Sequence, residues 1–324
     1  MITLKQAQKT INDSINKLQF DSKPKELYEP IIYTLKLGGK RIRPALILLG
    51  CNLFSEDIKP AIFPAIAYEL LHNFTLVHDD IMDNANIRRG KQTVHKKWSN
   101  NAALLSGDAM CIKAYEYINK CDVRYLIEVT KAFNDAAIKV CEGQQLDMNF
   151  ETLLSVSEKE YLNMIGLKTS ALFASSLKTG AIIGGASSQD VELLYDFGLN
   201  LGFAFQLQDD FLDVFGEESA IGKEIGKDIV SNKKTFLLIK ALGLAKGTQL
   251  ESLKKWLQAI KPDPKEKIRE VQLIYVGLGI KELTIKAIEN YFIKSLEDLK
   301  KVSVPDNRKL ELKNFLRSLK NRKY

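Results

Sequence analysis

The feature that most constrains the fold is the absence of proline from residues 65–261 of this 324-residue chain. A proline inside a helix removes a hydrogen bond and clashes with the preceding turn, so a long stretch without proline is compatible with long helices. The stretch is rich in Ala, Leu, Ile, Lys and Glu. It is poor in the Asn-Gly and Asp-Gly pairs that mark β-hairpin turns. We therefore predict an all-α protein.

Two predicted helices, 61–81 and 197–215, are apolar on most faces and are expected at the centre of a helical bundle. With no solenoid repeat and no linker rich in Pro, Ser or Gly, we expect a single domain over residues 1–324, with a repeat array as the alternative. The predicted helices, with several more after Pro264, are 6–19, 31–37, 45–52, 61–81, 102–119, 123–149, 157–179, 191–214, 233–245 and 250–259.

The second apolar helix carries small and polar side chains at every fourth position, which places them on one face. This stripe either lets a neighbouring helix approach closely or contains two glycines that the helix merely tolerates. Its members are Gly198, Gly202, Gln206 and Asp210.

The charge balance argues against a protein that binds polyanions along its whole length. Lys and Arg number 47 and Asp and Glu number 40, and the tail from 261 to 324, with 16 basic and 9 acidic side chains, holds the whole excess. We interpret this tail as a solvated helical face, with a membrane or RNA patch as the alternative, and expect no nucleic-acid partner.

The sequence also predicts the compartment. Four scattered cysteines without a CxxC pair are expected to be reduced. The first residues are polar, and no segment reaches the roughly 18 to 20 unbroken apolar residues of a membrane span. We expect a cytoplasmic protein with no transmembrane segment.

The main functional signal is an acidic motif, DDxxD, that occurs twice, each time near the end of an apolar helix. The two copies comprise Asp79, Asp80 and Asp83, and Asp209, Asp210 and Asp213. Residues i and i+4 share a helix face, so the outer aspartates of each motif repel one another unless a cation binds. Oxygen ligands without supporting His or Cys favour Mg²⁺ or Mn²⁺, which complete their shells with water and phosphate oxygens. Two such clusters therefore predict a polyphosphate substrate.

Basic segments flank both acidic motifs, although each taken singly is as easily a surface charge run. Together they predict two anion pockets, one reached through metal and one through Arg and Lys directly. The segments are residues 38–44 (GGKRIRP), Arg88-Arg89-Gly90, and the lysines Lys223, Lys227, Lys233 and Lys234. His72, seven residues before Asp79 and so on nearly the same helix face, is a candidate phosphate donor, and a buried core histidine is the alternative.

These motifs, in this order, resemble the trans-isoprenyl diphosphate synthases, or polyprenyl synthetases. The resemblance runs from about Leu35 to Thr235. It rests on the two DDxxD motifs and on GGKRIRP (38–44), ELLHNFTLVHDDIMD (69–83), RRG (88–90) and GKEIGKDIVSNKKT (222–235).

The resemblance implies antiparallel helices around a deep central cavity, usually in a homodimer, with the two Asp motifs facing each other at the cavity mouth. It implies a Mg²⁺-dependent prenyltransferase that condenses isopentenyl diphosphate with an allylic diphosphate in trans (E) geometry. The allylic diphosphate would ionise to a cation, so no protein nucleophile is required. Three Mg²⁺ ions, with Mn²⁺ as a substitute, would bind Asp79, Asp83 and Asp209, supported by Asp80, Asp210 and Asp213.

The resemblance also assigns the other site residues by position in the motifs. The allylic diphosphate would contact Arg88, Lys168, Lys223 and Lys233. Isopentenyl diphosphate would contact Lys40, Arg43, His72 and Arg89. Gln144 and Asp147 match a GQxxD motif that lines the metal site, and Thr169 and Gln206 would lie near the reacting carbons.

Product length is implied by the residues before the first Asp motif, where bulky side chains close the product tunnel in this family. Phe74 and Thr75 lie five and four residues before Asp79. This pattern resembles the synthases that make geranylgeranyl diphosphate, and farnesyl diphosphate is the second expected product. On an ideal helix Thr75 lies closer to the Asp79 face, so either residue could form the floor. Gln92 stands where relatives often carry proline, which affects only the shape of that loop.

Three other functions fit these residues less well. A class I terpene cyclase shares the fold and one Asp motif, but it has no use for the second diphosphate pocket that residues 38–44 predict. An HD-type metal phosphohydrolase is suggested by His78-Asp79, but it would need more histidine ligands than His72 and His95 supply, and it leaves the second DDxxD unexplained. A non-catalytic helical protein would bind RNA or lipid through the basic tail, which has few aromatic residues to stack on bases.

Overall fold

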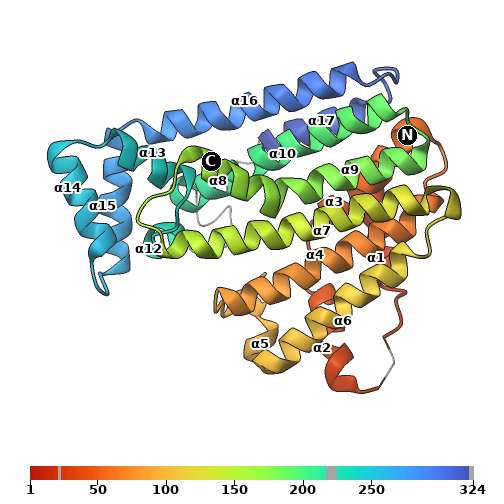
Figure 1. The fold of residues 1–324 in the computed structure, drawn as a ribbon, viewed down its shortest axis with the longest axis horizontal. Helices are drawn as coiled ribbons and strands as arrows, with labels where there is room; N and C mark the ends of the chain where they lie inside the picture. The colour runs from red at the N-terminus through yellow and green to blue at the C-terminus, as the bar shows by residue number, and fades with distance from the viewer. Residues whose placement is uncertain (21–22, 217–224, 321–324) are drawn as a thin grey trace. The chain divides into compact units, whose positions relative to one another are not determined.

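The computed structural model describes residues 1–20, 23–216 and 225–320, and this part of the chain is almost entirely helical (Figure 1). The prediction of an all-α protein is confirmed. The described helices, in chain order, are α1 (Leu4–Ile15), α2 (Lys25–Lys36), α3 (Ile42–Phe54), η1 (Lys59–Ala61), α4 (Ile62–Met82), α5 (Val94–Lys97), α6 (Asn100–Ile118), α7 (Val123–Thr152), α8 (Glu158–Ile165), η2 (Gly166–Ser170), α9 (Ala171–Gly184), α10 (Ser188–Phe215), α12 (Lys227–Val230), α13 (Phe236–Leu244), α14 (Gly247–Gln258), α15 (Pro264–Gly277), α16 (Ile280–Lys301) and α17 (Leu310–Lys320).

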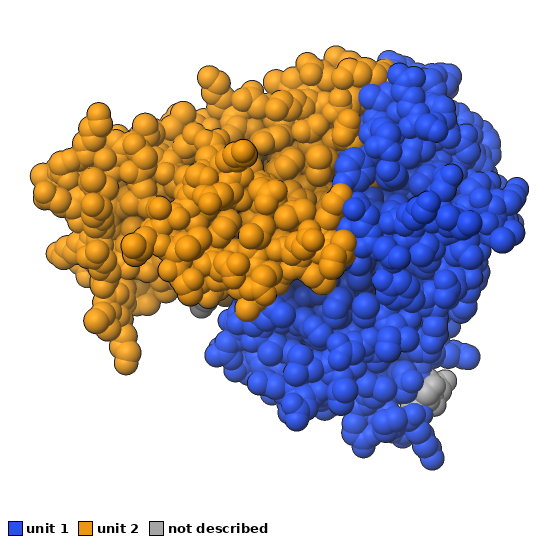
Figure 2. Space-filling model, viewed as in Figure 1, with its two compact units in different colours: residues 1–137, 175–195, 302–312 blue, residues 138–174, 196–301, 313–324 orange. Residues whose placement is uncertain are grey.

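The backbone divides into two compact units, coloured separately in Figure 2. Unit 1 comprises residues 1–137, 175–195 and 302–312, and unit 2 comprises residues 138–174, 196–301 and 313–324. The division falls within helices α7, α9, α10 and α17. The single polyprenyl synthetase domain over residues 1–324 stays a prediction.

Helix α4 forms the core of unit 1, where it packs against α6 and α3. Its first four turns are buried on nearly every face, as the apolar sequence predicts. The hydroxyl of Tyr68, which is fully buried, hydrogen-bonds Ser175 Oγ at 2.5 Å and Thr179 Oγ1 at 2.8 Å. Apart from Glu69, the acidic side chains of α4 lie at its C-terminal end, so the first Asp motif projects from the end of a largely buried helix.

In unit 2, helices α13, α14 and α15 enclose a separate apolar core, with α14 and α15 side by side (Figure 1). Val214, from the end of α10, and Ile229, from α12, belong to the same core. The ends of α10, which carries the second Asp motif, and of α12, which begins at Lys227, are thus anchored to one apolar cluster.

Two local features depart from the predicted run of helices. Strands β1 (Ile87–Arg88) and β2 (Lys91–Gln92) pair antiparallel around Arg89-Gly90, whose φ angles of 52° and 73° fit a type I′ hairpin turn. The helix predicted over 157–179 is interrupted by the π-helical turn η2. No helix in the described ranges has the length and apolarity needed to cross a bilayer.

Candidate active site

The first Asp motif lies at the C-terminal end of α4, in unit 1. Asp79 is half-buried, Asp80 is buried and Asp83, which ends the helix, is exposed. The side chain of Arg88 donates to both Asp80 oxygens, from Nε at 2.8 and 2.9 Å, and its NH2 nitrogen lies 3.5 Å from Asp79 Oδ2. Burial raises the pKa of Asp80, and Arg88 opposes this shift.

The Arg88-Arg89-Gly90 hairpin points its second arginine toward residues 38–39. The guanidinium of Arg89 donates to the Gly38 carbonyl oxygen. A Cβ atom at Gly39 would lie 2.8 Å from that guanidinium, and the φ of Gly39 is 140°, so glycine is required there. This contact joins the Gly pair to the RRG motif.

The three cations of residues 38–44 lie in different environments. Lys40 is exposed and Arg43 is half-buried, with NH1 3.1 Å from His72 Nε2. Arg41 is buried instead, and it forms an ion pair with Glu69, whose side chain is equally buried. Of the predicted isopentenyl site, the structure therefore brings Arg43 and His72 together, while Arg41 faces the protein interior.

The surroundings of His72 lower the pKa of its ring. Burial lowers its pKa well below the usual value, and the charges of Arg43, Arg89, Arg88 and Arg41 lower it further. Because a guanidinium only donates, Nε2 of His72 accepts from Arg43, and the neutral ring carries its proton on Nδ1. His72 is thus a neutral side chain among charged arginine side chains.

The two residues predicted to set product length lie on different sides of α4. The Phe74 ring packs edge-on against His78, with ring centroids 4.7 Å apart, and His78 in turn contacts the Leu104 carbonyl oxygen of α6 at 3.2 Å. The Thr75 hydroxyl donates to the carbonyl oxygen of His72 at 2.8 Å. Phe74 therefore contacts a residue that itself touches α6, and Thr75 bonds to the backbone of the turn that carries His72.

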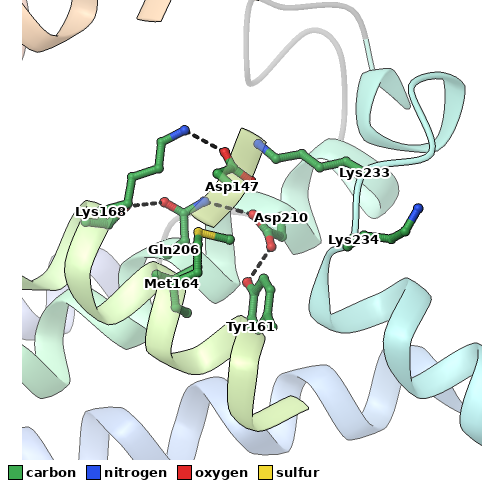
Figure 3. Close-up of a pocket in the computed structure, with 10 residues that line it drawn as sticks. Asp147, Tyr161, Met164, Lys168, Gln206, Asp210, Lys233 and Lys234 are labelled. Atoms are coloured by element: carbon green, nitrogen blue, oxygen red, sulfur yellow. Dashed lines mark hydrogen bonds and ion pairs between the residues drawn. The ribbon is translucent and has the colours of Figure 1, made fainter. Parts of the chain in front are cut away.

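Unit 2 contains a polar pocket at the second Asp motif (Figure 3). Its walls come from α7, α8, η2 and α10, and from the segment before α13. The lining residues are Asp147, Tyr161, Met164, Ile165, Lys168, Thr169, Gln206, Asp210, Lys233 and Lys234. The structure thus brings together five predicted site residues besides Asp210. Gln144 lies one turn before Asp147 on α7 and is half-buried, and it is not among the lining residues.

Close backbone packing brings these side chains together. A Cβ atom at Gly143 of α7 would lie 2.7 Å from the Lys168 Cα, and one at Gly202 of α10 would lie 2.7 Å from the Ser170 Cβ. Both helices therefore touch the π-helical turn η2, a type of irregular turn that is frequent at functional sites. The glycine stripe of α10 is a close-approach surface, and the tolerated-glycine alternative is wrong.

Four side-chain hydrogen bonds connect the pocket walls. Lys168 Nζ donates to Asp147 Oδ2 at 2.6 Å. Thr169 Oγ1 donates to Gln206 Oε1, and Gln206 Nε2 donates to Asp210 Oδ1, both at 2.8 Å. The hydroxyl of Tyr161 donates to the other oxygen of Asp210 at 2.5 Å.

Three carboxyl groups in or beside this pocket have raised pKa values. Burial raises the pKa of Asp210 to about 7 and that of Asp228 to about 6, and it also raises the pKa of Asp213. Lys233 lowers all three values without cancelling the effect of burial. A bound cation would stabilise the ionised forms further.

The donor set fits a hard divalent cation that takes only part of its shell from protein. Both Asp motifs lie near helix C-termini, where the helix dipole disfavours carboxylates and favours cations. Within residues 1–20, 23–216 and 225–320, no group of three or more His, Cys, Asp or Glu side chains forms a complete metal cage. Mg²⁺ commonly binds one or two carboxylates and completes its shell with water and phosphate oxygens.

Sequence reasoning missed three residues that shape this site. Tyr161 has no motif around it. Asp228 lies in the segment 222–235 but was not singled out, and its backbone N–H donates to Asp213 Oδ2 at 2.9 Å. Lys267 is 1% exposed, and its Nζ donates to Asn232 Oδ1 at 2.6 Å, which holds the turn before Lys233. Lys223, also predicted for the site, lies outside the described residues.

An all-α fold whose two units each pair an Asp motif with cationic side chains defines a metal-assisted enzyme rather than a scaffold. The polyprenyl synthetase family model matches residues 24–274. The short chain isoprenyl diphosphate synthase of Methanothermobacter thermautotrophicus is 40% identical over 284 residues, which cover 87% of this chain and 80% of that relative. The geranylgeranyl diphosphate synthase of Methanosarcina mazei is 41% identical over 244 residues, 74% of each chain.

Comparison with solved structures gives the same family. A crystal structure of a geranylgeranyl pyrophosphate synthase matches with a TM-score of 0.94 and 42% identity, covering all of both chains. The chain belongs to the polyprenyl synthetase family, and it is a prenyltransferase. Members of this family use a divalent metal ion.

Proposed function

We propose that this prenyltransferase condenses isopentenyl diphosphate with an allylic diphosphate in trans geometry and makes geranylgeranyl diphosphate in preference to farnesyl diphosphate. Relatives named geranylgeranyl diphosphate synthase support the product. The observation that carries the proposal is the pocket of unit 2, where Lys168 and Lys233 accompany Asp147 and Asp210 beside the Thr169–Gln206 pair. Such a pocket provides cations for a diphosphate and oxygen atoms for a carbocation.

The proposed metal is Mg²⁺, three ions per site, with Mn²⁺ able to substitute. Asp79, Asp83 and Asp209 are its proposed main ligands, with Asp80 and Asp213 in support. When bound, Mg²⁺ neutralises negative charge on the diphosphate leaving group. Asp80 is held by Arg88, which agrees with its proposed supporting role.

The proposed roles of the remaining residues come from the family resemblance. Arg88, Lys168, Lys223 and Lys233 bind the allylic diphosphate, with Gln144 and Asp147 nearby. Lys40, Arg43, His72 and Arg89 bind isopentenyl diphosphate. This second group supplies three charges and a neutral imidazole, which suits an anion bound without metal.

The reaction then needs no protein nucleophile. The bond between the allylic carbon and the diphosphate oxygen breaks, and both electrons leave with the diphosphate. The double bond of isopentenyl diphosphate supplies the electron pair of the new carbon–carbon bond, and the proton lost afterwards goes to the departing diphosphate. The side-chain oxygens of Thr169 and Gln206 stabilise the allylic cation between these steps.

Phe74 is the proposed floor of the product tunnel, with Thr75 as the second candidate. Its large ring is held in place by His78, so its removal lengthens the space available to the product. We expect Phe74→Ala to make longer products. Phe63→Ala, which alters another phenylalanine of α4, serves as the control. Products of Phe74→Ala no longer than those of the wild type would contradict the floor assignment.

The test of the function is an incubation of the protein with Mg²⁺, isopentenyl diphosphate and, separately, dimethylallyl, geranyl and farnesyl diphosphates. We expect discrete elongated products, twenty carbons long, that vanish with a chelator. Asp79→Asn should abolish most of the activity, while Asp13→Asn, an exposed aspartate of α1, should not. Cyclic products formed without isopentenyl diphosphate would instead identify a terpene cyclase, and no turnover would favour a non-catalytic binding protein.

A further inference from the structure

Asp210 lies at the centre of a hydrogen-bonded chain that uses both of its oxygens. Gln206 Nε2 donates to Oδ1 at 2.8 Å, and the Tyr161 hydroxyl donates to Oδ2 at 2.5 Å. Figure 3 shows Gln206 and Tyr161 on either side of this carboxylate. Tyr161 and Asp210 are 1% and 4% exposed, so water does not compete for these bonds.

This chain fixes the orientation of the Gln206 amide. An amide has a donor end and an acceptor end, and a carboxylate only accepts. With Asp210 ionised, Gln206 therefore turns Nε2 toward Asp210 and its carbonyl oxygen toward Thr169, whose hydroxyl donates to that oxygen at 2.8 Å. Both Thr169 and Gln206 line the pocket, so the orientation decides whether an oxygen or an N–H group is presented there.

The backbone places the three elements so that the chain can form. Gln206 and Asp210 are one turn apart on α10, on the same face as Gly202, which touches Ser170 of η2. Tyr161 lies on α8, whose start is fixed by a capping box between Ser157 and Glu160. The hydroxyl of Tyr161 thus reaches Asp210 from a well-defined helix.

We propose that Tyr161 is a positioning residue: through Asp210 it holds the Gln206 amide so that its oxygen faces the forming allylic cation. This inference rests on the proposed function and deepens it. A side-chain oxygen stabilises positive charge, whereas an N–H group aimed at the same point destabilises it. Asp210 acts in this chain as an orienting group.

The test compares the steady-state kinetics of Tyr161→Phe with those of the wild type. Phenylalanine keeps the ring that packs near Phe236 and removes only the hydroxyl. We expect kcat to fall about 10-fold, as for the loss of one hydrogen bond to a charged group. The KM values for both diphosphates and the Mg²⁺ concentration for half-maximal rate should stay unchanged, a split that a general loss of structure would not give. Tyr275→Phe, a buried tyrosine of the unit 2 core, is the matched control and should behave as the wild type.

Asp210→Asn tests the orientation itself, because asparagine can present either a donor or an acceptor to Gln206. Its kcat should fall further, and the double variant Tyr161→Phe/Asp210→Asn should be no worse than Asp210→Asn alone, since both act through one chain. Wild-type kcat in Tyr161→Phe, a raised Mg²⁺ requirement with unchanged kcat, or additive effects would each overturn the proposal. A wild type that elongates no primer would instead overturn the proposed function, and with it this role of Tyr161.

Discussion

At the scale of single residues, neighbouring cations of residues 38–44 have different tasks. Lys40 is exposed, whereas Arg41 lies in the interior in a left-handed backbone conformation with φ of 46°. Besides the Glu69 ion pair, its guanidinium donates to the Leu35 carbonyl oxygen at 2.6 Å and to Asn12 at 3.1 Å. Arg41 therefore fixes the segment that presents Lys40 and Arg43.

We predict that Arg41→Met lowers the free energy of unfolding by about 3 to 5 kcal/mol, because it leaves the Glu69 carboxylate buried without its partner. Lys40→Met should change it by less than about 0.5 kcal/mol and should raise the KM for isopentenyl diphosphate instead. Urea unfolding measures the first quantity and initial rates the second. Equal stability of the two variants would contradict this division of tasks, and Arg41→Met/Glu69→Met should recover part of the loss.

The lowered pKa of His72 predicts how the free energy of unfolding depends on pH. The pKa of His72 is lower in the folded protein than in the unfolded chain, where it is about 6.5. Below about pH 6.5 the unfolded chain therefore binds more protons than the folded protein. The stability contribution of the neutral ring is therefore complete above about pH 6.5 and is lost as the pH falls toward the folded pKa. The free energy of unfolding should decline less steeply between pH 7 and pH 5 in His72→Gln than in the wild type. Parallel pH profiles would show that His72 does not titrate in this way.

At the scale of the elements, the contact between α10 and η2 determines whether the pocket forms. A Cβ atom at Gly202 would lie 2.7 Å from the Cβ and 2.8 Å from the Oγ of Ser170, so α10 would have to move. That movement would pull Gln206 away from Thr169, which is adjacent to Ser170. The helix contact and the hydrogen-bonded chain of the pocket are therefore one structural feature.

We predict that Gly202→Ala lowers the free energy of unfolding by about 1 to 3 kcal/mol through overpacking, and that it lowers kcat as well. Gly243→Ala is the control, because a Cβ atom there meets no described atom within 4 Å and alanine is the better helix former. That variant should raise stability by up to about 1 kcal/mol. Chemical unfolding and product assays of both variants provide the measurements, and a Gly202→Ala enzyme with wild-type kcat would contradict the coupling.

At the scale of the whole molecule, the sequence was informative wherever a property is local or repeated. Proline placement and apolar periodicity predicted the helices, and the paired motifs predicted the family and most pocket residues. The inward turn of Arg41 was not predictable, because it depends on Glu69, a residue 28 positions away that carries no local signal. Tyr161 was missed for the same reason, since its role depends on a contact 49 residues distant in sequence. The π-helical turn depends on the close approach of Gly143 and Gly202, which spacing alone does not predict.

The homodimer stays a prediction, and an apolar surface of unit 1 supports it. On α6, Leu105 and Ile112 are 61% and 64% exposed, two turns apart on one face, and Ile127 of α7 is 69% exposed. A helix face with this much exposed apolar surface is typical of an interface. We propose a second copy of this chain as its occupant, because the same face on each copy is self-complementary under two-fold symmetry.

We predict that Ile112→Glu weakens the dimer at least about 100-fold, because two-fold symmetry buries the new carboxylate twice in an apolar contact without a partner. Sedimentation equilibrium at micromolar concentration should give a 36.6 kDa monomer for this variant and twice that mass for the wild type. Leu310→Glu, which charges an exposed leucine of α17 (50% exposed), is the matched control and should remain dimeric. A dimeric Ile112→Glu would exclude this face as the interface, and a monomeric wild type would exclude the homodimer itself.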